Sequence, residues 1–232
     1  YTRVAFSLSF FMMRIFASEE QKKLYVKPKP AVYNSFDMDE EGLLYATSED
    51  ANSRIQILNA AGTNIFKAGS YGEVTLDANG LPVSPTLTDI TVSPSGIITV
   101  IQGNNNKLYQ YDKNGNLLAV FGGQGTVKGF FEVPAAVVAG PDNRIYVLDS
   151  ARGDITVFQP TSFINNVIQA LDHYQEGDYD GAYELWEKVY EVDAGYPLAN
   201  NGLGLTKYKQ EDLKSAMEYY KTADNKEGYS TA

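Results

Sequence analysis

The chain has 232 residues, of which 44% are hydrophobic, and its formal net charge is −10. A chain of this length and composition can bury a core, whereas its acidity argues against nucleic-acid binding, which needs clustered Lys and Arg. The absence of Cys excludes disulfides, zinc-thiolate sites and a cysteine nucleophile. Any Ser-His-Asp triad would have to use His173, the only histidine in the sequence.

Residues 1–29 form the first segment, which we expect to be helical or connecting. A helix over residues 5–24 would carry an aromatic face made of Phe6, Phe10, Met13 and Phe16. The alternative is a targeting segment, because "VAFSLSFFMM" is apolar, but Arg14 and "ASEEQKK" follow directly and make a poor cleavage site. No other stretch of the sequence is expected to cross a membrane.

Short strand-like runs recur three times in the following part of the chain. Gly42, Gly96 and Asn143 occupy corresponding positions, each followed by a run of this kind: "LLYAT", "IITVI" and "RIYVL". After a polar gap, a second run follows in each unit: "RIQIL", "KLYQY" and "DITVF". Their β-branched and aromatic residues predict strands, and "DKNGNLL" predicts a hairpin with a type I′ Asn-Gly turn. Small antiparallel sheets of this kind cannot bury both faces alone, and stacking them radially gives a β-propeller.

The details of these units resemble NHL-repeat propellers. In "GFFEVPAAVVAGPDNRIYVLDSARGDITVF" (129–158), a Pro precedes the first strand, a polar turn follows, and the last strand ends in Phe. The resemblance is strongest over residues 84–160 and implies NHL-like blades over residues 30–160. Such propellers usually have six blades, whereas the resemblance gives about three here. We therefore expect an incomplete ring.

A helical period marks the last part of the chain, residues 161–232. Ala182 recurs as Ala216, Ala170 recurs as Gly204, and Trp186 recurs as Tyr220, always at the same spacing. Small residues thus recur where helices would approach closely. "GDYDGAYELWEKVYEVDAGYP" and this spacing resemble tetratricopeptide (TPR) repeats. The resemblance implies two such helical repeats and a truncated third.

Several motifs are candidate sites of chemistry. "DMDEEG" (37–42) matches the opening of a calcium loop, but Ser48 stands where the closing bidentate Glu should be, so a blade turn is favoured. "GNNNK" (103–107) could contact a sugar, although a solvated turn is favoured. Asp149 is expected to bond the turn that follows its strand, and His173 to be a packing or surface residue. We expect no catalytic residue, no metal and no cofactor.

The TPR resemblance implies a concave groove lined by the first helix of each repeat. Carried over by position, its partner-binding residues are Val167, Leu171, Tyr174, Gln175, Asn201, Leu205, Tyr208 and Lys209. The alternative is that this face packs against the rest of the fold. An NHL propeller followed by TPR repeats resembles poorly characterised surface proteins of Gram-positive bacteria.

The function expected from this resemblance is a non-enzymatic interaction or scaffold module with a protein or peptide partner. The expected location is extracytoplasmic, with membrane anchoring through a segment that this chain lacks. The alternative function is a propeller enzyme of the lactonase or lyase type, with a divalent metal on the propeller axis.

Overall fold

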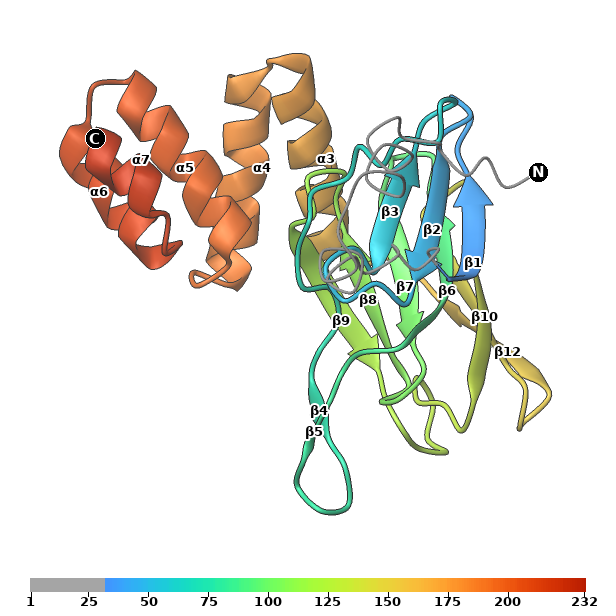
Figure 1. The fold of residues 1–232 in the computed structure, drawn as a ribbon. Coiled ribbons are helices and arrows are strands. Elements are labelled where there is room, and N and C mark those ends of the chain that lie inside the picture. Colours follow the sequence, from blue (N-terminus) through green and yellow to red (C-terminus); the bar gives the residue numbers. More distant parts are fainter. Residues whose placement is uncertain (1–31) are drawn as a thin grey trace, which may run out of the picture. The chain divides into compact units, whose positions relative to one another are not determined.

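The computed structural model describes residues 32–232, which form one compact unit (Figure 1). The helix expected over residues 5–24, like the rest of the segment 1–29, lies outside the described residues. Within residues 32–232, the strands run from Tyr33 to Phe158 and the helices from Ser162 to Thr231, so the change from strand to helix falls where the sequence predicts it.

Several antiparallel sheets that resemble propeller blades make up the strand region (Figure 1). The first sheet has the order β1 (Tyr33–Met38), β2 (Leu44–Ser48) and β3 (Ile55–Leu58). The second has the order β6 (Leu87–Val92), β7 (Ile98–Gln102), β8 (Lys107–Tyr111) and β9 (Leu117–Gly122). The third has the order β10 (Pro134–Ala139), β11 (Ile145–Asp149) and β12 (Asp154–Phe158). A two-stranded hairpin, β4 (Thr75–Leu76) and β5 (Pro82–Val83), lies in the connection between the first two sheets.

The turn between β8 and β9 differs from the predicted type I′ turn. Gly115 N–H donates to the Asp112 carbonyl, and of the loop residues only Gly115 has a positive φ, of 81°. A type I′ turn needs positive φ at both central residues, so this is a type I turn followed by a left-handed glycine. The Asp112 carboxylate selects this form, because its Oδ1 accepts the N–H groups of Asn114 and Asn116 at 2.9 and 2.8 Å.

Apolar side chains fill the space between successive sheets. One core joins the first and second sheets around Tyr45, Ile55, Ile98 and Val100. Another joins the second and third sheets around Ile101, Leu108, Phe131, Val137 and Val147. The sheets are therefore stacked face to face, as the propeller prediction requires.

Polar side chains link the first strands of the three sheets, β1, β6 and β10. Thr91 Oγ1 donates to Asp37 Oδ2 at 2.8 Å and accepts the N–H of Ala139 at 3.1 Å. Asp89 accepts a hydrogen bond from Ser35 and, at 2.7 Å, from the N–H of Val137. Each carboxylate thus joins one sheet to another.

Five helices follow the sheets: α3 (Ser162–Glu176), α4 (Tyr179–Val192), α5 (Pro197–Lys209), α6 (Leu213–Thr222) and α7 (Lys226–Thr231). Side-chain oxygens cap α3, α4 and α6 at Thr161, Asp178 and Asp212, and Pro197 begins α5, as suits its missing N–H. None of the described helices is long and apolar enough to span a membrane.

The helices pack as the helical period predicts. Ala170, Ala182, Gly204 and Ala216 are all buried. Trp186 belongs to the main helical core. That core extends to Ile97 and Leu118 of the second sheet region, and the Tyr196 hydroxyl donates to the Leu118 carbonyl at 3.1 Å. The first helices are thus attached to the sheets by both apolar and polar contacts.

Candidate functional site

The eight residues predicted to bind a partner divide into two groups. Val167 and Leu171 are buried in the helical core, so these two side chains pack the helices and are not accessible to a partner in this structure. They lie one turn apart on the same side of α3. The other residues, Tyr174, Gln175, Asn201, Leu205, Tyr208 and Lys209, are exposed or half-buried, and their role in binding stays a prediction.

Tyr179, which the sequence analysis missed, brings two of the predicted residues together. The rings of Tyr174 and Tyr179 meet edge to face with centroids 5.4 Å apart. On the same ring of Tyr179, the Lys209 ammonium lies 3.1 Å from the centroid. The contact joins the end of α5 to the start of α4. In the sequence, Tyr179 is marked only by its position directly after the N-cap residue Asp178.

Tyr208 lies beside Lys209 in the last turn of α5, and its phenol is one of the groups that act on Tyr220 of α6. Burial raises the pKa of the Tyr220 phenol, and the neighbouring phenols of Tyr174 and Tyr208 raise it further. Tyr220 is buried on α6, whereas Tyr174 and Tyr208 remain exposed. The result is an aromatic surface with one cation, which we call the tyrosine face: Tyr174, Tyr179, Tyr208 and Lys209.

His173 lies beside this face and has a structural partner. Its Nδ1 is 2.8 Å from Asp178 Oδ2, while Asp178 Oδ1 accepts the N–H of Gly181 at 3.0 Å and so caps α4. The Gly181 hydrogen bond, with His173 second, lowers the pKa of Asp178. His173 therefore ties the end of α3 to the start of α4, in keeping with the expected packing or surface role.

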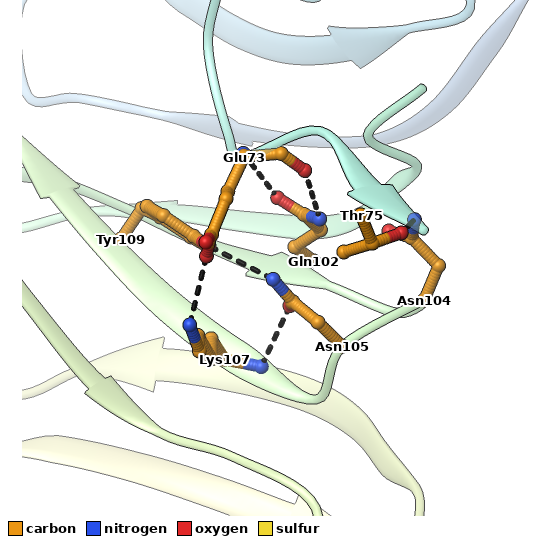
Figure 2. Close-up of polar contacts among 7 residues, drawn as sticks. All are labelled: Glu73, Thr75, Gln102, Asn104, Asn105, Lys107 and Tyr109. Carbon is orange, nitrogen blue, oxygen red and sulfur yellow. Dashed lines mark hydrogen bonds and ion pairs between the residues drawn. The ribbon is translucent and has the colours of Figure 1, made fainter. Parts of the chain in front are cut away.

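A second polar cluster fixes the long connection between the first two sheets (Figure 2). The main chain of Glu73 exchanges two hydrogen bonds of 2.8 Å with the fully buried amide of Gln102. Its carboxylate pairs with Lys107 at 2.7 Å and accepts from the Tyr109 hydroxyl at 3.0 Å. The hydrogen bond from Lys107, followed by that from Tyr109, lowers the pKa of Glu73, and burial raises the pKa of Tyr109 to about 12.

The amides of the "GNNNK" loop are engaged within the fold and do not form a free sugar-binding edge. Asn104 donates to Thr75 Oγ1 at 3.0 Å, and Asn105 donates to the Tyr109 hydroxyl at 2.9 Å (Figure 2). Asn106 is buried and donates to Gln124 Oε1 at 2.7 Å. The loop therefore has a structural role, and its amides make more hydrogen bonds within the protein than the solvated turn favoured by the sequence would make.

The acidic "DMDEEG" stretch forms a blade turn. Asp39 Oδ1 accepts the N–H groups of Glu41 and Leu43 at 3.0 and 2.9 Å. Asp37 Oδ2 accepts the N–H of Val92 in the second sheet. Asp149 is likewise occupied, since it accepts N–H groups from the turn that follows it and from Glu132. Within residues 32–232 there is no group of three or more His, Cys, Asp or Glu side chains placed to hold a metal.

A cavity of about 240 Å³ lies between the second and third sheets and α3. Its lining is mostly apolar and includes Phe121, Phe158 and Ile168. The polar side chains of Gln110 and Thr99 also line it, and they bond each other at 3.2 Å. No residue predicted to bind a partner lines this cavity.

Comparison with known proteins gives structural likenesses at low similarity. No protein-family profile matches the sequence, and no curated protein matches it. Virginiamycin B lyase from Staphylococcus aureus aligns with a TM-score of 0.34 and 18% identity, over 59% of this chain and 45% of that chain. A protein of unknown function from Bacteroides caccae aligns with a TM-score of 0.27 and 12% identity, over 58% of this chain and 63% of that one.

A third match is the extracellular domain of a putative hybrid two-component system from B. thetaiotaomicron. It aligns with a TM-score of 0.22 and 18% identity, over 59% of this chain and 23% of that one. The chain thus spans less than two thirds of the length of each of these structures. These neighbours are β-propeller-like proteins, and at this level of similarity the likeness is one of fold alone.

Proposed function

We propose that the protein is a non-enzymatic interaction module of a bacterial extracytoplasmic, membrane-associated assembly. In this proposal the sheets are NHL-like blades of an incomplete propeller ring, and the helices are TPR-like repeats that hold a protein or peptide segment. The tyrosine face carries the proposal, because it gathers exposed aromatic side chains and a cation from α3, α4 and α5.

The chemistry of this face suits a peptide partner with an acidic group. Tyr side chains offer apolar area together with a hydroxyl, which is why they are enriched at protein interfaces. The Lys209 ammonium rests on one side of the Tyr179 ring and has donors left for a carboxylate. In residues 162–232, Asp and Glu outnumber Lys and Arg by about two to one, so Lys209 is a local cation in an acidic region. An acidic side chain or a C-terminal carboxylate of the partner would bind there.

The alternative, a lactonase-type or lyase-type enzyme with a divalent metal on the propeller axis, needs free ligands on the first strands of the sheets, β1, β6 and β10, of which β6 contacts the other two. Asp37 and Asp89 are the acids of these strands in the first two sheets, and both accept hydrogen bonds from a neighbouring sheet. Their engagement supports the interaction module over the enzyme.

The test is the double substitution Tyr174→Ala with Tyr208→Ala, and Tyr229→Ala on α7 is the matched control. All three tyrosines are exposed to a similar extent, so we expect each substitution to lower the free energy of unfolding by about 1 kcal/mol or less, with the largest loss for Tyr174→Ala because its ring packs on Tyr179. The assay is capture of a solubilised cell-envelope partner by the immobilised chain, followed by thermal unfolding of each variant.

We expect the double variant to lose capture and the control to keep it. If the double variant instead loses several kcal/mol of stability and captures the partner as before per folded molecule, the tyrosine face belongs to the core and the proposal fails. Loss of capture by the Tyr229→Ala control would equally contradict it, because the effect would not be specific to the tyrosine face.

A further inference from the structure

The three blade-like sheets have equivalent positions that can be compared one by one. Their turns align at Asp39, Ser93 and Gly140, each of which exchanges the same two main-chain hydrogen bonds across its turn. In each sheet, one face turns toward the next sheet along the chain and the other toward the preceding sheet. We call these the forward face and the backward face.

The forward face of the third sheet is open where the other two are covered. Ile55 and Leu108 occupy one position in the first and second sheets, and both are 0% exposed. The equivalent residue of the third sheet, Ile155, is 63% exposed. The other exposed apolar members of this face are Val138, Leu148 and Val157.

The backward face of the first sheet is open along β1, whereas Ala46 and Gln56 of the same face, on β2 and β3, are buried. Ile90 and Val137, at equivalent positions of the second and third sheets, are each 3% exposed. Their equivalent in the first sheet is Phe36, which is 71% exposed, and Met38 beside it is 60% exposed. The stack therefore has exposed apolar side chains on the forward face of the third sheet and along β1 on the backward face of the first sheet, at positions that are buried in the other sheets.

The residues of the two open faces differ from those at the equivalent positions of the internal faces. In the second sheet, Asp89 and Thr91 on the forward face accept main-chain N–H groups from the third sheet. The third sheet has Ala136 and Val138 at these positions, so its forward face cannot repeat that polar link. Ala136 is the smallest residue at its position, and Phe36 is the largest at the corresponding place on a backward face. A large apolar side chain thus faces a small one if these two faces meet.

We propose that the forward face of the third sheet in one copy of this chain packs on the backward face of the first sheet in a second copy. Both internal interfaces already join a forward face to a backward face, and a second copy supplies the missing face at each end. The pairing uses unlike faces, so it is heterologous, and two copies can satisfy both ends of each other if the ring closes. This contact is separate from the tyrosine face, so it stands whether or not that face binds a partner.

The test uses the full chain with one charged substitution in each open face: Phe36→Asp and Ile155→Asp. Sedimentation velocity over a range of concentrations gives the mass of each variant, and circular dichroism with thermal unfolding checks that it folds. Leu76→Asp on β4 is the matched control, because Leu76 is 69% exposed and lies on neither face.

We expect the unchanged chain and the Leu76→Asp control to associate, and each face variant alone to shift toward the monomer. A mixture of the Phe36→Asp and Ile155→Asp chains should associate again, since together they retain one intact forward face and one intact backward face. A monomeric unchanged chain at high concentration would overturn the proposal. So would association of the Phe36→Asp chain with itself, or a mixture that stays monomeric, because the pairing would then not be forward to backward.

Discussion

The substitution Gly202→Ala tests how closely α4 and α5 approach. A Cβ at position 202 would overlap Cδ1 and Nε1 of Trp186 and lie 2.9 Å from its Cγ. Trp186 is buried in the helical core and has no room to move away without disturbing its neighbours. Gly202 lies inside α5 with ordinary helical backbone, so the glycine is not needed for its conformation.

Two opposing effects determine how much Gly202→Ala changes the free energy of unfolding. Replacing Gly by Ala inside a helix stabilises the helix by about 1 kcal/mol, because Gly loses more backbone entropy on folding. Overpacking a close contact typically costs about 1–3 kcal/mol. Since the overlap is with rigid ring atoms, we expect the cost to prevail and the free energy of unfolding to fall by up to about 2 kcal/mol.

A double-mutant cycle separates the clash from the helix propensity. Urea unfolding is followed by far-ultraviolet circular dichroism for the unchanged chain, Gly202→Ala, Trp186→Leu and the double variant, since the only Trp cannot serve as the probe. With Leu at position 186 the added methyl has space, so Gly202→Ala should become neutral or stabilising in that background. If Gly202→Ala stabilises the chain by about 1 kcal/mol in both backgrounds, the close approach is refuted.

Three further outcomes are expected. Ala182→Trp and Gly204→Trp should each lower the urea midpoint, since both sites are buried at helix contacts, and unchanged midpoints would contradict the register. Asp37→Ala should destabilise the chain by about 1–3 kcal/mol through lost hydrogen bonds, whereas calcium should leave the melting temperature of the unchanged chain as it is. A rise of several degrees with calcium that Asp37→Ala abolishes would instead indicate a metal site. The lowered pKa of Glu73 means that its ion pair with Lys107 stabilises the fold above the pKa of the unfolded state and is lost as pH falls through the folded-state pKa. The stability difference between the unchanged chain and Glu73→Gln should therefore be present at neutral pH and vanish in acid, and a difference that persists in acid would show that the pair has no such role.

Features that depend on local pattern could be predicted from the sequence. The positions of the strands and helices follow from β-branched runs and from the helical period, and the buried small residues, such as Ala170 and Ala216, follow from the same period. The prediction of a type I′ turn was wrong because it considered the pattern "NG" without the preceding Asp112. A carboxylate at that position stabilises a type I turn, and the glycine then takes only the last, left-handed place.

The candidate site could be predicted only in part, because the resemblance gives one face of a helix and does not give which turns of that face the fold covers. Val167, Leu171 and Tyr174 share one face of α3, but the first two are buried and Tyr174, in the last turn of the helix, is exposed. Tyr179 could not be predicted as part of the site, because its contact with Lys209 joins two residues far apart in the sequence and forms only in the folded protein. A contact between side chains of two different repeats leaves no periodic signal in the sequence.

The polar residues of β1 and β6 show that polar side chains that suggest a ligand site in the sequence can instead join sheets of the fold. Asp37 belongs to the "DMDEEG" stretch that resembles the opening of a calcium loop, and Asp89 and Thr91 lie on the neighbouring strand β6. In the fold, each satisfies a main-chain N–H of another sheet, a group that would otherwise be costly to bury. Their loss at the third sheet, where apolar Val138 takes the corresponding place, removes that link at the face left open. The same positions therefore distinguish an internal face from an end face, and this distinction makes the pairing of the two ends a physical proposal about the chain.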